Sequence, residues 1–317
     1  MSESPAVAVS GLVKRYRGRA VVDGLDLVAA PGAVTAVLGP NGAGKTTTVE
    51  CCEGLRRPDA GTVRVLGLDP ARDGAALRPR VGVMLQDGGL PAAVPAGQVL
   101  RHIARMYARP QDPRDLTARL GLGAIARTPV RRLSGGERQR LALAVAVVGR
   151  PDVAFLDEPS AGLDPQARIA VWDLVRGLRD GGAAVILTTH LMADAEALAD
   201  HVVVVDAGRV VAHGTVDELT GARDGIEVTA RGTVPDDAEA SLTAALAAAL
   251  DARPGADAAP EVTRTGPGTL EVRATPDPRV QHAVTGWALA AGLVVDLRPT
   301  RRTLEDVFLD LTGRSLR

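Results

Sequence analysis

The chain of 317 residues has few aromatic side chains, few lysines and few cysteines. Six aromatic residues argue against the stacked aromatic platforms that bind single-stranded nucleic acid, and the net charge of -1 argues against a general binder of polyanions. The two cysteines, Cys51 and Cys52, are adjacent, which is too few and too close for a disulfide framework. We expect them to be small buried hydrophobic residues, with redox sensing as the alternative.

The sequence also lacks a long apolar run. The longest charge-free segment, residues 27–44, is interrupted by prolines and glycines, whereas crossing a bilayer takes about 20 consecutive apolar residues. Glu3 stands where a signal peptide would carry its basic start, and Lys14 and Arg15 interrupt any apolar stretch that follows. The sequence therefore predicts a chain that stays in the cytosol.

Charge is unevenly distributed along the chain. Residues 1–150 hold 22 basic and 12 acidic groups, whereas residues 151–317 hold 15 and 26. Much of the positive excess lies in residues 101–132, where eight arginines face two aspartates. This segment is either a solvated helical face or a surface that faces an anionic membrane or an acidic partner.

Strand and helix patterns alternate through the first 220 residues. Buried strands are expected at residues 34–38, 80–85, 153–157 and 184–188, and helices at 45–56, 97–108, 134–148, 166–179 and 192–199. Residues 101–133 contain no convincing strand and are interpreted as a helical insertion. The alternation predicts an α/β fold with a largely parallel sheet.

The pattern changes after His213. Residues 221–225 are predicted to be a linker, and residues 254–260 a loop. Strands are expected at 226–230, 269–274 and 293–297, and helices at 238–250 and 280–291. These elements predict a small α/β domain of about 90 residues.

Residues 39–46 read GPNGAGKT and match the pattern G-x-x-x-x-G-K-[ST] in full. The segment follows an apolar strand and opens a helix, so its backbone N–H groups and the helix N-terminus can bind phosphate. The Lys45 ammonium is expected to reach the β- and γ-phosphates, and the Thr46 hydroxyl to contact Mg²⁺. The candidate nucleotide-binding residues here are Gly39, Pro40, Asn41, Gly42, Ala43, Gly44, Lys45, Thr46 and Thr47.

Two carboxylates follow the apolar strand of residues 153–157, which reads VAFLD before Glu158. Neighbouring strand residues point in opposite directions, so the two acids cannot share one role. Asp157 suits coordination of Mg²⁺, and Glu158 suits a group that orients or deprotonates an attacking water. A simple turn at the end of the strand is the alternative.

A second anion site is expected in the segment LSGGERQR, residues 133–140. Ser134 and Glu137 form a capping box ahead of an apolar run, so a helix is predicted to begin at Ser134. Gly135 and Gly136 leave its first turn bare, and free N–H groups beside a hydroxyl can bind an anion. Taken alone, the feature is more often only a helix cap.

Together these motifs resemble the ATP-binding cassette (ABC) family, because the phosphate loop, the LSGGE segment and the VAFLDE strand occur in that family's order. The segment SAGLD, ending at Asp164, resembles its D-loop, and TTH, ending at His190, carries its switch histidine. Gln86 resembles the Q-loop glutamine, and Tyr16 the aromatic that stacks on adenine. The resemblance covers residues 1–220.

The resemblance implies a P-loop NTPase cassette, with a RecA-like core, an antiparallel β subdomain and a helical insertion. It implies a head-to-tail homodimer with two ATP molecules between the cassettes and Mg²⁺ as cofactor. Catalytic roles fall on Glu158, His190, Gln86 and Lys45, and Mg²⁺ contacts on Thr46, Gln86 and Asp157. The γ-phosphate of one copy would face Ser134, Gly135 and Gly136 of the other, and Asp164 would report across the interface.

The C-terminal segment reads LEDVFLDLTGR, residues 304–314, and is similar to the ending of ATPases in drug exporters of the daunorubicin-resistance type. Leu304, Val307, Phe308 and Leu311 have helical spacing, so the segment is also expected to be an amphipathic helix with these four side chains facing the core. The expected domains are a nucleotide-binding domain, 1–220, and a small α/β accessory domain, 226–317.

The expected function is ATP hydrolysis that drives export of a drug or antibiotic through a separately encoded membrane permease. The chain would sit on the cytoplasmic face of the membrane, and residues 101–132 fall in the subdomain that docks the permease in this family. No nucleic-acid partner is expected. The alternatives are a soluble ABC ATPase acting in translation or DNA repair, and a regulatory binder that does not hydrolyse ATP. The transported substrate is not encoded in this chain.

Overall fold

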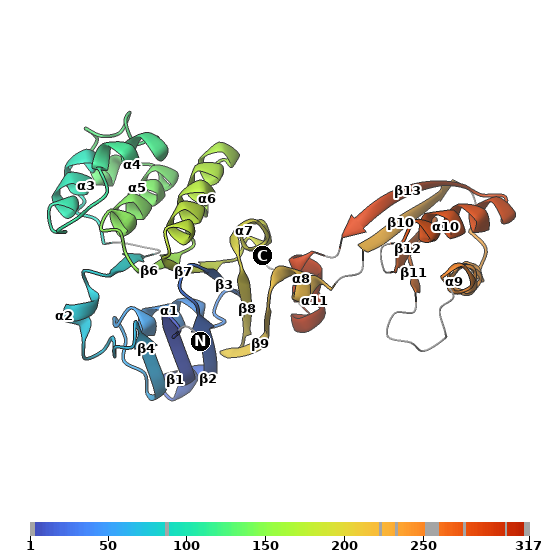
Figure 1. Ribbon diagram of the computed structural model, residues 1–317, viewed down its shortest axis with the longest axis horizontal. Coiled ribbons are helices and arrows are strands. Elements are labelled where there is room, and N and C mark those ends of the chain that lie inside the picture. The colour runs from blue at the N-terminus through green and yellow to red at the C-terminus, as the bar shows by residue number, and fades with distance from the viewer. Residues whose placement is uncertain are drawn as a thin grey trace. The chain divides into compact units, whose positions relative to one another are not determined.

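Figure 1 shows a computed structural model of the chain, which describes residues 4–85, 89–221, 224–231, 234–250, 260–274, 277–301 and 303–313. The chain forms two compact units, one made of residues up to Leu219 together with those from Phe308 onward, the other of Thr220–Val307. The second unit is therefore an insertion between two parts of the first. This division differs from the expected domains, 1–220 and 226–317, by returning the last residues to the first unit.

The first unit is built on a six-stranded sheet in the order β5-β6-β7-β3-β8-β9. Its strands are β3 (Val34–Leu38), β5 (Val81–Met84), β6 (Val153–Asp157), β7 (Ala184–Thr189), β8 (His201–Asp206) and β9 (Arg209–Gly214). All pairings are parallel except that of β8 with β9. Every residue of β3, β6 and β7 is buried, as is typical of a parallel sheet covered on both faces. The predicted α/β class and largely parallel sheet are confirmed.

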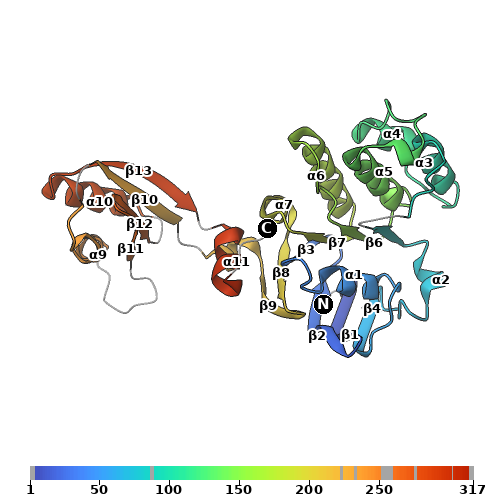
Figure 2. The same ribbon diagram turned by 180° about the vertical axis from the view of Figure 1, so that it is seen from behind.

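Helix α1 (Lys45–Cys52) follows β3, α6 (Pro165–Asp180) connects β6 with β7, and α7 (Met192–Leu198) connects β7 with β8; Figure 2 shows them from behind. On α1, Cys51 and Cys52 are both free and buried, which confirms the expectation for the two cysteines. Burial raises the pKa of Cys51 to about 11 and that of Cys52 still further. Reactive thiols need a lowered pKa and some exposure, so both behave as packing residues.

An antiparallel sheet in the order β2-β1-β4 packs beside the parallel one. Its strands are β1 (Val7–Tyr16), β2 (Arg19–Ala29) and β4 (Ala60–Val65), and the short helix α2 (Gly74–Leu77) follows. Leucines and valines of all three strands share one hydrophobic core with α1 and with Phe155 of β6. This sheet is the antiparallel subdomain that the family resemblance implied.

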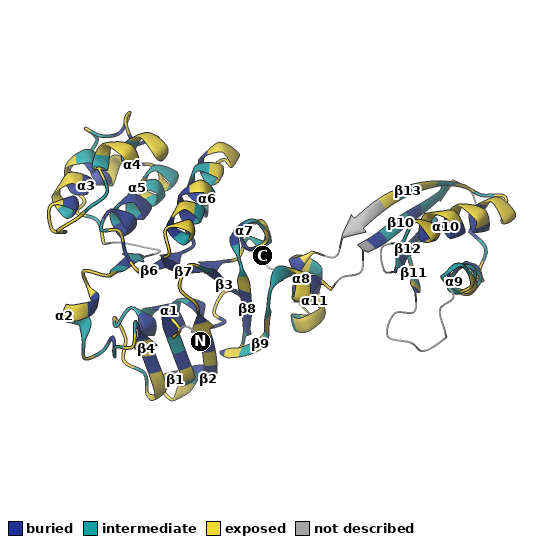
Figure 3. Cartoon of the chain, viewed as in Figure 1, coloured by how far each residue is buried: buried dark blue, intermediate teal, exposed yellow. Residues whose placement is uncertain are grey.

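The predicted helical insertion is confirmed by α3 (Ala96–Ala104), α4 (Pro113–Arg119), the 3₁₀ helix Val130–Arg132 and α5 (Gly135–Val147). Its leucines are buried, among them Leu100, Leu116 and Leu141. Figure 3 shows how buried and exposed surfaces alternate around these helices. All eight arginines of residues 101–132 are exposed, as both a solvated face and a surface that faces a partner require.

The second unit follows the order β10 (Asp224–Arg231), α9 (Ala238–Ala249), β11 (Glu261–Gly266), β12 (Thr269–Arg273), α10 (Pro278–Ala290) and β13 (Val294–Arg301). Its antiparallel sheet has the order β11-β12-β10-β13, which is the split βαβ arrangement of ferredoxin-like folds. Val228, Leu242, Leu270 and Trp287 belong to its core. The indole N–H of Trp287 donates to Ser241 Oγ at 3.0 Å.

Some expectations for this unit were wrong. Strand β11 was not predicted, because its residues alternate between exposed and half-buried and include no strongly apolar run. The linker predicted at 221–225 already contains the start of β10 at Asp224, because this strand pairs with β13 from its first residue. Most of the loop expected at 254–260 lies outside the described residues.

Helix α8 (Val216–Thr220) ends at the first residue of the second unit, and α11 (Leu304–Thr312) begins in the second unit and ends in the first. Leu304, Val307 and Phe308 of α11 are buried as predicted, but Leu311 is 45% exposed. Leu311 is the penultimate residue of α11, and the expectation that it faces the core was wrong. None of the helices in the described part of the chain has both the length and the apolar character needed to cross a bilayer.

Candidate active site

The carboxyl ends of three neighbouring strands carry the predicted motifs. Strand β7 lies between β3 and β6, and the three strands are parallel. Their carboxyl ends therefore lie at one edge of the sheet, where open α/β sheets bind ligands. β3 leads into the phosphate loop, β6 ends at Asp157 before Glu158, and β7 ends just before His190. The fold thus brings together groups that are more than 100 residues apart.

The phosphate loop depends on two of its glycines for its close packing. A Cβ atom at Gly39 would overlap the Val205 carbonyl. Gly44, which precedes α1, has φ 101°, and a Cβ there would lie 2.7 Å from the Val21 carbonyl oxygen. A side chain at either position would push the loop away from these carbonyls. The loop would then lose the shape in which its backbone N–H groups approach phosphate closely.

A cavity of about 190 Å³ lies on this loop. Val21, Asn41, Gly42, Ala43, Gly44, Lys45, Thr46, Thr47 and Glu158 line it. Most of the residues predicted to hold phosphate therefore surround one space, together with the carboxylate predicted to activate water. Gly39 and Pro40 are not among its lining residues, but their carbonyls contact the Lys45 ammonium.

Lys45 is 7% exposed, and its Nζ donates to the carbonyl oxygens of Gly39 at 2.6 Å and Pro40 at 3.1 Å. Burial lowers the pKa of Lys45, and the nearby charges of Glu158 and Asp157 oppose that shift. The loop's own carbonyls thus hold the ammonium inside the loop. A phosphate in this cavity would offer it a stronger, charged acceptor.

The backbone of Glu158 is held in an unusual conformation. Its φ is 53°, in the left-handed region that costs a residue with a Cβ about 1 to 2 kcal/mol. The Glu158 N–H donates to the Thr188 carbonyl at 3.1 Å and lies 3.2 Å from the Thr188 Oγ1, and its carbonyl accepts from Gln139 Nε2. Thr188 Oγ1 also donates to Asp157. These bonds hold the Glu158 backbone and the Asp157 carboxylate in place, and the two acidic residues line different cavities.

His190 lies next to Glu158, with His190 Nδ1 2.7 Å from Glu158 Oε2. Within the described residues Oε2 accepts no hydrogen bond. The carboxylate oxygen therefore keeps lone pairs for a water molecule. The His190 side chain is 44% exposed and Glu158 is 9% exposed, so the pair lies at the wall of the site.

A second cavity, of about 250 Å³, lies on the other side of Thr46. Thr46, Val49, Glu50, Glu53, Leu55, Leu85 and Asp157 line it. Burial raises the pKa of Glu53 to about 8, with smaller contributions from Asp157 and Glu50. Sequence reasoning missed Glu53, although Thr46, Val49, Glu50 and Glu53 have the i, i+3, i+4, i+7 spacing of one helix face.

Helix α5 begins with the capping box predicted at Ser134. The Ser134 N–H donates to Glu137 Oε2 at 2.8 Å, and the Glu137 N–H donates to Ser134 Oγ at 3.3 Å. The bond from the Ser134 N–H lowers the pKa of Glu137. Ser134 and Gly135 are exposed and Gly136 is half-buried, and the three do not line the phosphate cavity of their own chain.

Three other residues were predicted for the nucleotide site, Asp164, Tyr16 and Gln86, and of these Asp164 and Tyr16 do not line the phosphate cavity. Asp164 caps α6, and its Oδ1 accepts from the Ala167 N–H at 2.9 Å. Tyr16 ends β1, with the Lys14 ammonium and the Arg56 guanidinium 5.7 Å and 5.5 Å from its ring centre. Gln86 lies outside the described residues.

A phosphate loop between a buried strand and a helix, with an acidic strand end two strands away in the same sheet, defines a P-loop nucleoside triphosphatase. The family model described as ABC transporter matches residues 22–161. The chain is 40% identical to the daunorubicin resistance ATP-binding protein DrrA3 of Streptomyces coeruleorubidus, over 97% of this chain and 96% of that protein. The chain therefore belongs to the ATP-binding proteins of ABC transporters.

Two other comparisons agree. The chain is 37% identical to the Nod factor export ATP-binding protein I of Ralstonia nicotianae, over 100% of this chain and 97% of that protein. A solved ATP-binding subunit of an ABC transporter superposes with a TM-score of 0.63 and 27% identity, over 68% of this chain and 91% of that chain. The chain binds and hydrolyses ATP as members of its family do, and such subunits pair with membrane permeases and dimerise.

Proposed function

We propose that this ATPase powers the export of a small organic molecule, of the drug or antibiotic class, through a separately encoded permease. The observation that carries the hydrolytic part is Glu158, which lines the phosphate cavity beside Lys45 and contacts His190. The export part is supported by relatives that match nearly the whole chain and are named for daunorubicin resistance and Nod factor export. These relatives do not favour the alternative role in translation or DNA repair.

In the proposed reaction, the loop N–H groups, Lys45, Thr46 and Thr47 bind the phosphates of ATP. The Glu158 carboxylate accepts a hydrogen bond from the attacking water and takes its proton as the bond to the γ-phosphorus forms and ADP leaves. His190 stabilises the γ-phosphate and the water. Tyr16 stacks on adenine, and the proposed catalytic role of Gln86 rests on its resemblance to the Q-loop glutamine.

Mg²⁺ fits the oxygens found beside the loop. Thr46 and the buried Asp157 line one cavity with Glu50 and Glu53, and the Glu53 Oε2 accepts no hydrogen bond within the described residues. Hydroxyl, carboxylate and phosphate oxygens are the ligands that Mg²⁺ prefers. Thr46 and Asp157, with Gln86, would hold the ion, which neutralises charge on the β- and γ-phosphates when bound.

The complete site is proposed to form between two copies of the chain. The start of α5 is accessible and carries bare N–H groups at Gly135 and Gly136, and it is not part of the phosphate cavity in its own chain. In the homodimer, Ser134, Gly135 and Gly136 would bind the γ-phosphate held by the partner copy. Asp164 would lie near the same interface.

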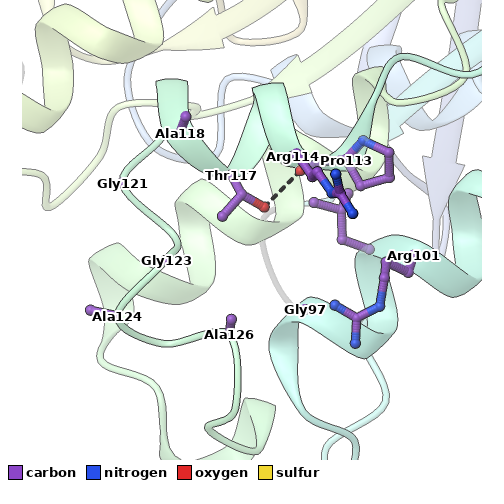
Figure 4. A pocket seen from close by; sticks show the side chains of 11 residues that line it. Gly97, Arg101, Pro113, Arg114, Thr117, Ala118, Gly121, Gly123, Ala124 and Ala126 are labelled. Carbon is purple, nitrogen blue, oxygen red and sulfur yellow. Dashed lines mark hydrogen bonds between the residues drawn. The ribbon is translucent and has the colours of Figure 1, made fainter.

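We propose that the helical insertion carries a docking surface for the permease at the cavity that Figure 4 shows. A cavity of about 710 Å³ is lined mainly by small or apolar residues, including Gly97, Leu100 and Ala126, with the charged side chains of Arg101 and Arg114 beside them. A Cβ at Gly97 would lie 3.0 Å from the Ala126 carbonyl oxygen, so the backbones approach closely here. We infer that a cytoplasmic segment of the permease with an apolar face and acidic residues binds this cavity.

The test is coexpression with the permease, which would hold the ATPase at the cytoplasmic face of the membrane. Arg101→Glu with Arg114→Glu should remove the ATPase from isolated membranes and abolish its stimulation by cargo, with ATP affinity unchanged. Arg105→Glu is the control, because Arg105 is exposed but does not line the cavity. Normal membrane recovery of the double variant would contradict the docking surface. Steeply salt-dependent binding of nucleic acid would instead support the alternative role.

A further inference from the structure

A buried carboxylate outside the motifs lies close to the proposed catalytic pair. Asp194, on α7, is 1% exposed and accepts three hydrogen bonds from neutral donors. The donors are Ser160 Oγ, Trp172 Nε1 at 2.9 Å and Thr189 Oγ1 at 3.2 Å. In the described part of the chain no basic side chain forms an ion pair with Asp194.

Burying a carboxylate without a cation is costly, and the three donors satisfy the group only in this arrangement. An apolar side chain could pack α7 against the sheet without that cost. The donors come from different segments of the chain, so the carboxylate holds these segments together.

Two of the donors flank the catalytic pair. Ser160 is two residues after Glu158, in the loop that leads to α6, and Thr189 directly precedes His190. Thr189 Oγ1 also accepts from the Leu191 N–H at 2.9 Å, so the backbone on both sides of His190 is tied to the same hydroxyl. The Asp194 Oδ2 is thus the common acceptor for the segment after Glu158 and the segment that carries His190.

We propose that Asp194 is a positioning residue for ATP hydrolysis, which ties these two segments together and so holds His190 against Glu158. The inference rests on the proposed roles of Glu158 and His190. Asp194 touches neither the phosphate cavity nor the reacting atoms. It acts through the 2.7 Å contact between His190 Nδ1 and Glu158 Oε2.

Two substitutions at Asp194 distinguish the effect of its negative charge from the effect of its three hydrogen bonds. Asp194→Ala removes all three acceptors and leaves two hydroxyls and an indole N–H without a partner. Asp194→Asn has nearly the same shape, and its amide oxygen can accept from Trp172 while the amide N–H group donates to a rotated Ser160 or Thr189 hydroxyl. We therefore expect Asn to restore most of the activity that Ala loses.

The experiment measures kcat and KM for ATP with the purified full-length chain. Asp194→Ala should lower kcat by about 10-fold to 100-fold, the usual cost of losing a group that orients a reacting residue. KM for ATP should stay the same, because the phosphate loop is untouched, and Asp194→Asn should recover most of kcat. Asp173→Ala is the control, since Asp173 is an exposed carboxylate on α6. Unchanged kcat per folded Asp194→Ala molecule would overturn the inference.

A second measurement tests the route through His190. In a His190→Ala background, adding Asp194→Ala should lower kcat little further, because both changes remove the same arrangement. Losses that multiply would mean that Asp194 acts elsewhere. Glu158→Gln distinguishes the two proposals: a fully active Glu158→Gln would overturn the proposed function, whereas an inactive Glu158→Gln with a fully active Asp194→Ala would overturn only this inference.

Single-donor variants keep the test decisive if Asp194→Ala fails to fold. Ser160→Ala cuts the link to the Glu158 segment, and Trp172→Phe cuts only the link to α6. We expect kcat to fall with Ser160→Ala and to stay near wild type with Trp172→Phe. Equal effects of the two on kcat would indicate a purely structural role for Asp194.

Discussion

The two units of the chain differ in how many polar side chains they bury. Apart from Thr220, the buried polar and charged side chains of the described residues all belong to the first unit. They include Lys45, Asp157, Glu158 and Asp194, at or next to the carboxyl ends of the central strands. The core of the second unit consists of valine, leucine and alanine with Trp287. Since buried polar groups cost stability, their concentration in one unit marks where the chemistry takes place.

Glu158→Gln tests the first unit most directly, because it keeps the shape of the side chain but removes the carboxylate that we propose as the base. We expect kcat for ATP hydrolysis to fall by about 100-fold to 10,000-fold, while ATP binding is kept. Phosphate release and a nucleotide titration measure the two effects. Asp152→Asn, at an exposed carboxylate before the same strand, should change neither. Robust steady-state hydrolysis by Glu158→Gln would remove Glu158 as the key residue.

Lys45→Ala tests the other buried charge of the phosphate cavity. Loss of a charged hydrogen bond to phosphate, worth about 1.5 to 3 kcal/mol, should weaken nucleotide binding by about 10-fold to 100-fold. An equilibrium titration with ATP gives the Kd. Arg72→Ala, at a side chain that is 85% exposed, serves as the control. Undiminished binding by Lys45→Ala would count against the phosphate-loop assignment.

Leu242→Ala tests the second unit in the same way. Leu242 is fully buried in an apolar core, so truncation should destabilise this unit by about 2 to 5 kcal/mol. ATP affinity should not change. Denaturant unfolding monitored by the fluorescence of Trp287, after Trp172→Phe removes the other indole, measures the loss. Leu289→Ala, at an 82% exposed side chain, should have little effect on stability. A change in ATP affinity with Leu242→Ala would show that the two units depend on each other.

Glu53→Gln concerns the pH dependence of stability. The Glu53 pKa is raised from 4.5 to about 8 in the folded chain, so the unfolded chain releases this proton at lower pH than the folded chain does. The contribution of Glu53 to stability therefore falls as pH rises from about 4.5 to 8. Tm measured across this range should decline less for Glu53→Gln than for wild type, while Glu305→Gln, exposed on α11, should follow wild type. Parallel Tm curves for Glu53→Gln and wild type would contradict the raised pKa.

Local patterns made much of the first unit predictable. The strands at 34–38 and 153–157 are short apolar runs with clear ends, and the phosphate loop and the Ser134 capping box are defined by consecutive residues. Such features depend on neighbours in sequence, so a single sequence contains them. The spacing of Glu53 from Thr46 was equally visible but carried no motif that drew attention to it.

The residues that support the site could not be predicted in this way. Asp194 meets donors that are 34 and 22 positions away, and Gln139 bonds a carbonyl 19 positions away. In sequence, Asp194 is an ordinary polar residue of an alanine-rich helix, and only the packing of α7 against β7 and α6 gives it a role. Strand β11 was missed for a related reason, because pairing with β12 defines it and its own composition does not.

Because the two native thiols on α1 are buried, a cysteine introduced at the surface of the chain can be labelled selectively. Cys51 and Cys52 are its only cysteines, and burial with a raised pKa keeps both poorly reactive. A single cysteine introduced on an exposed surface could therefore be labelled with a maleimide dye without first removing the native pair. Any slow modification of the native thiols would in turn report transient opening of the helix that follows the phosphate loop, and bound ATP should slow that modification.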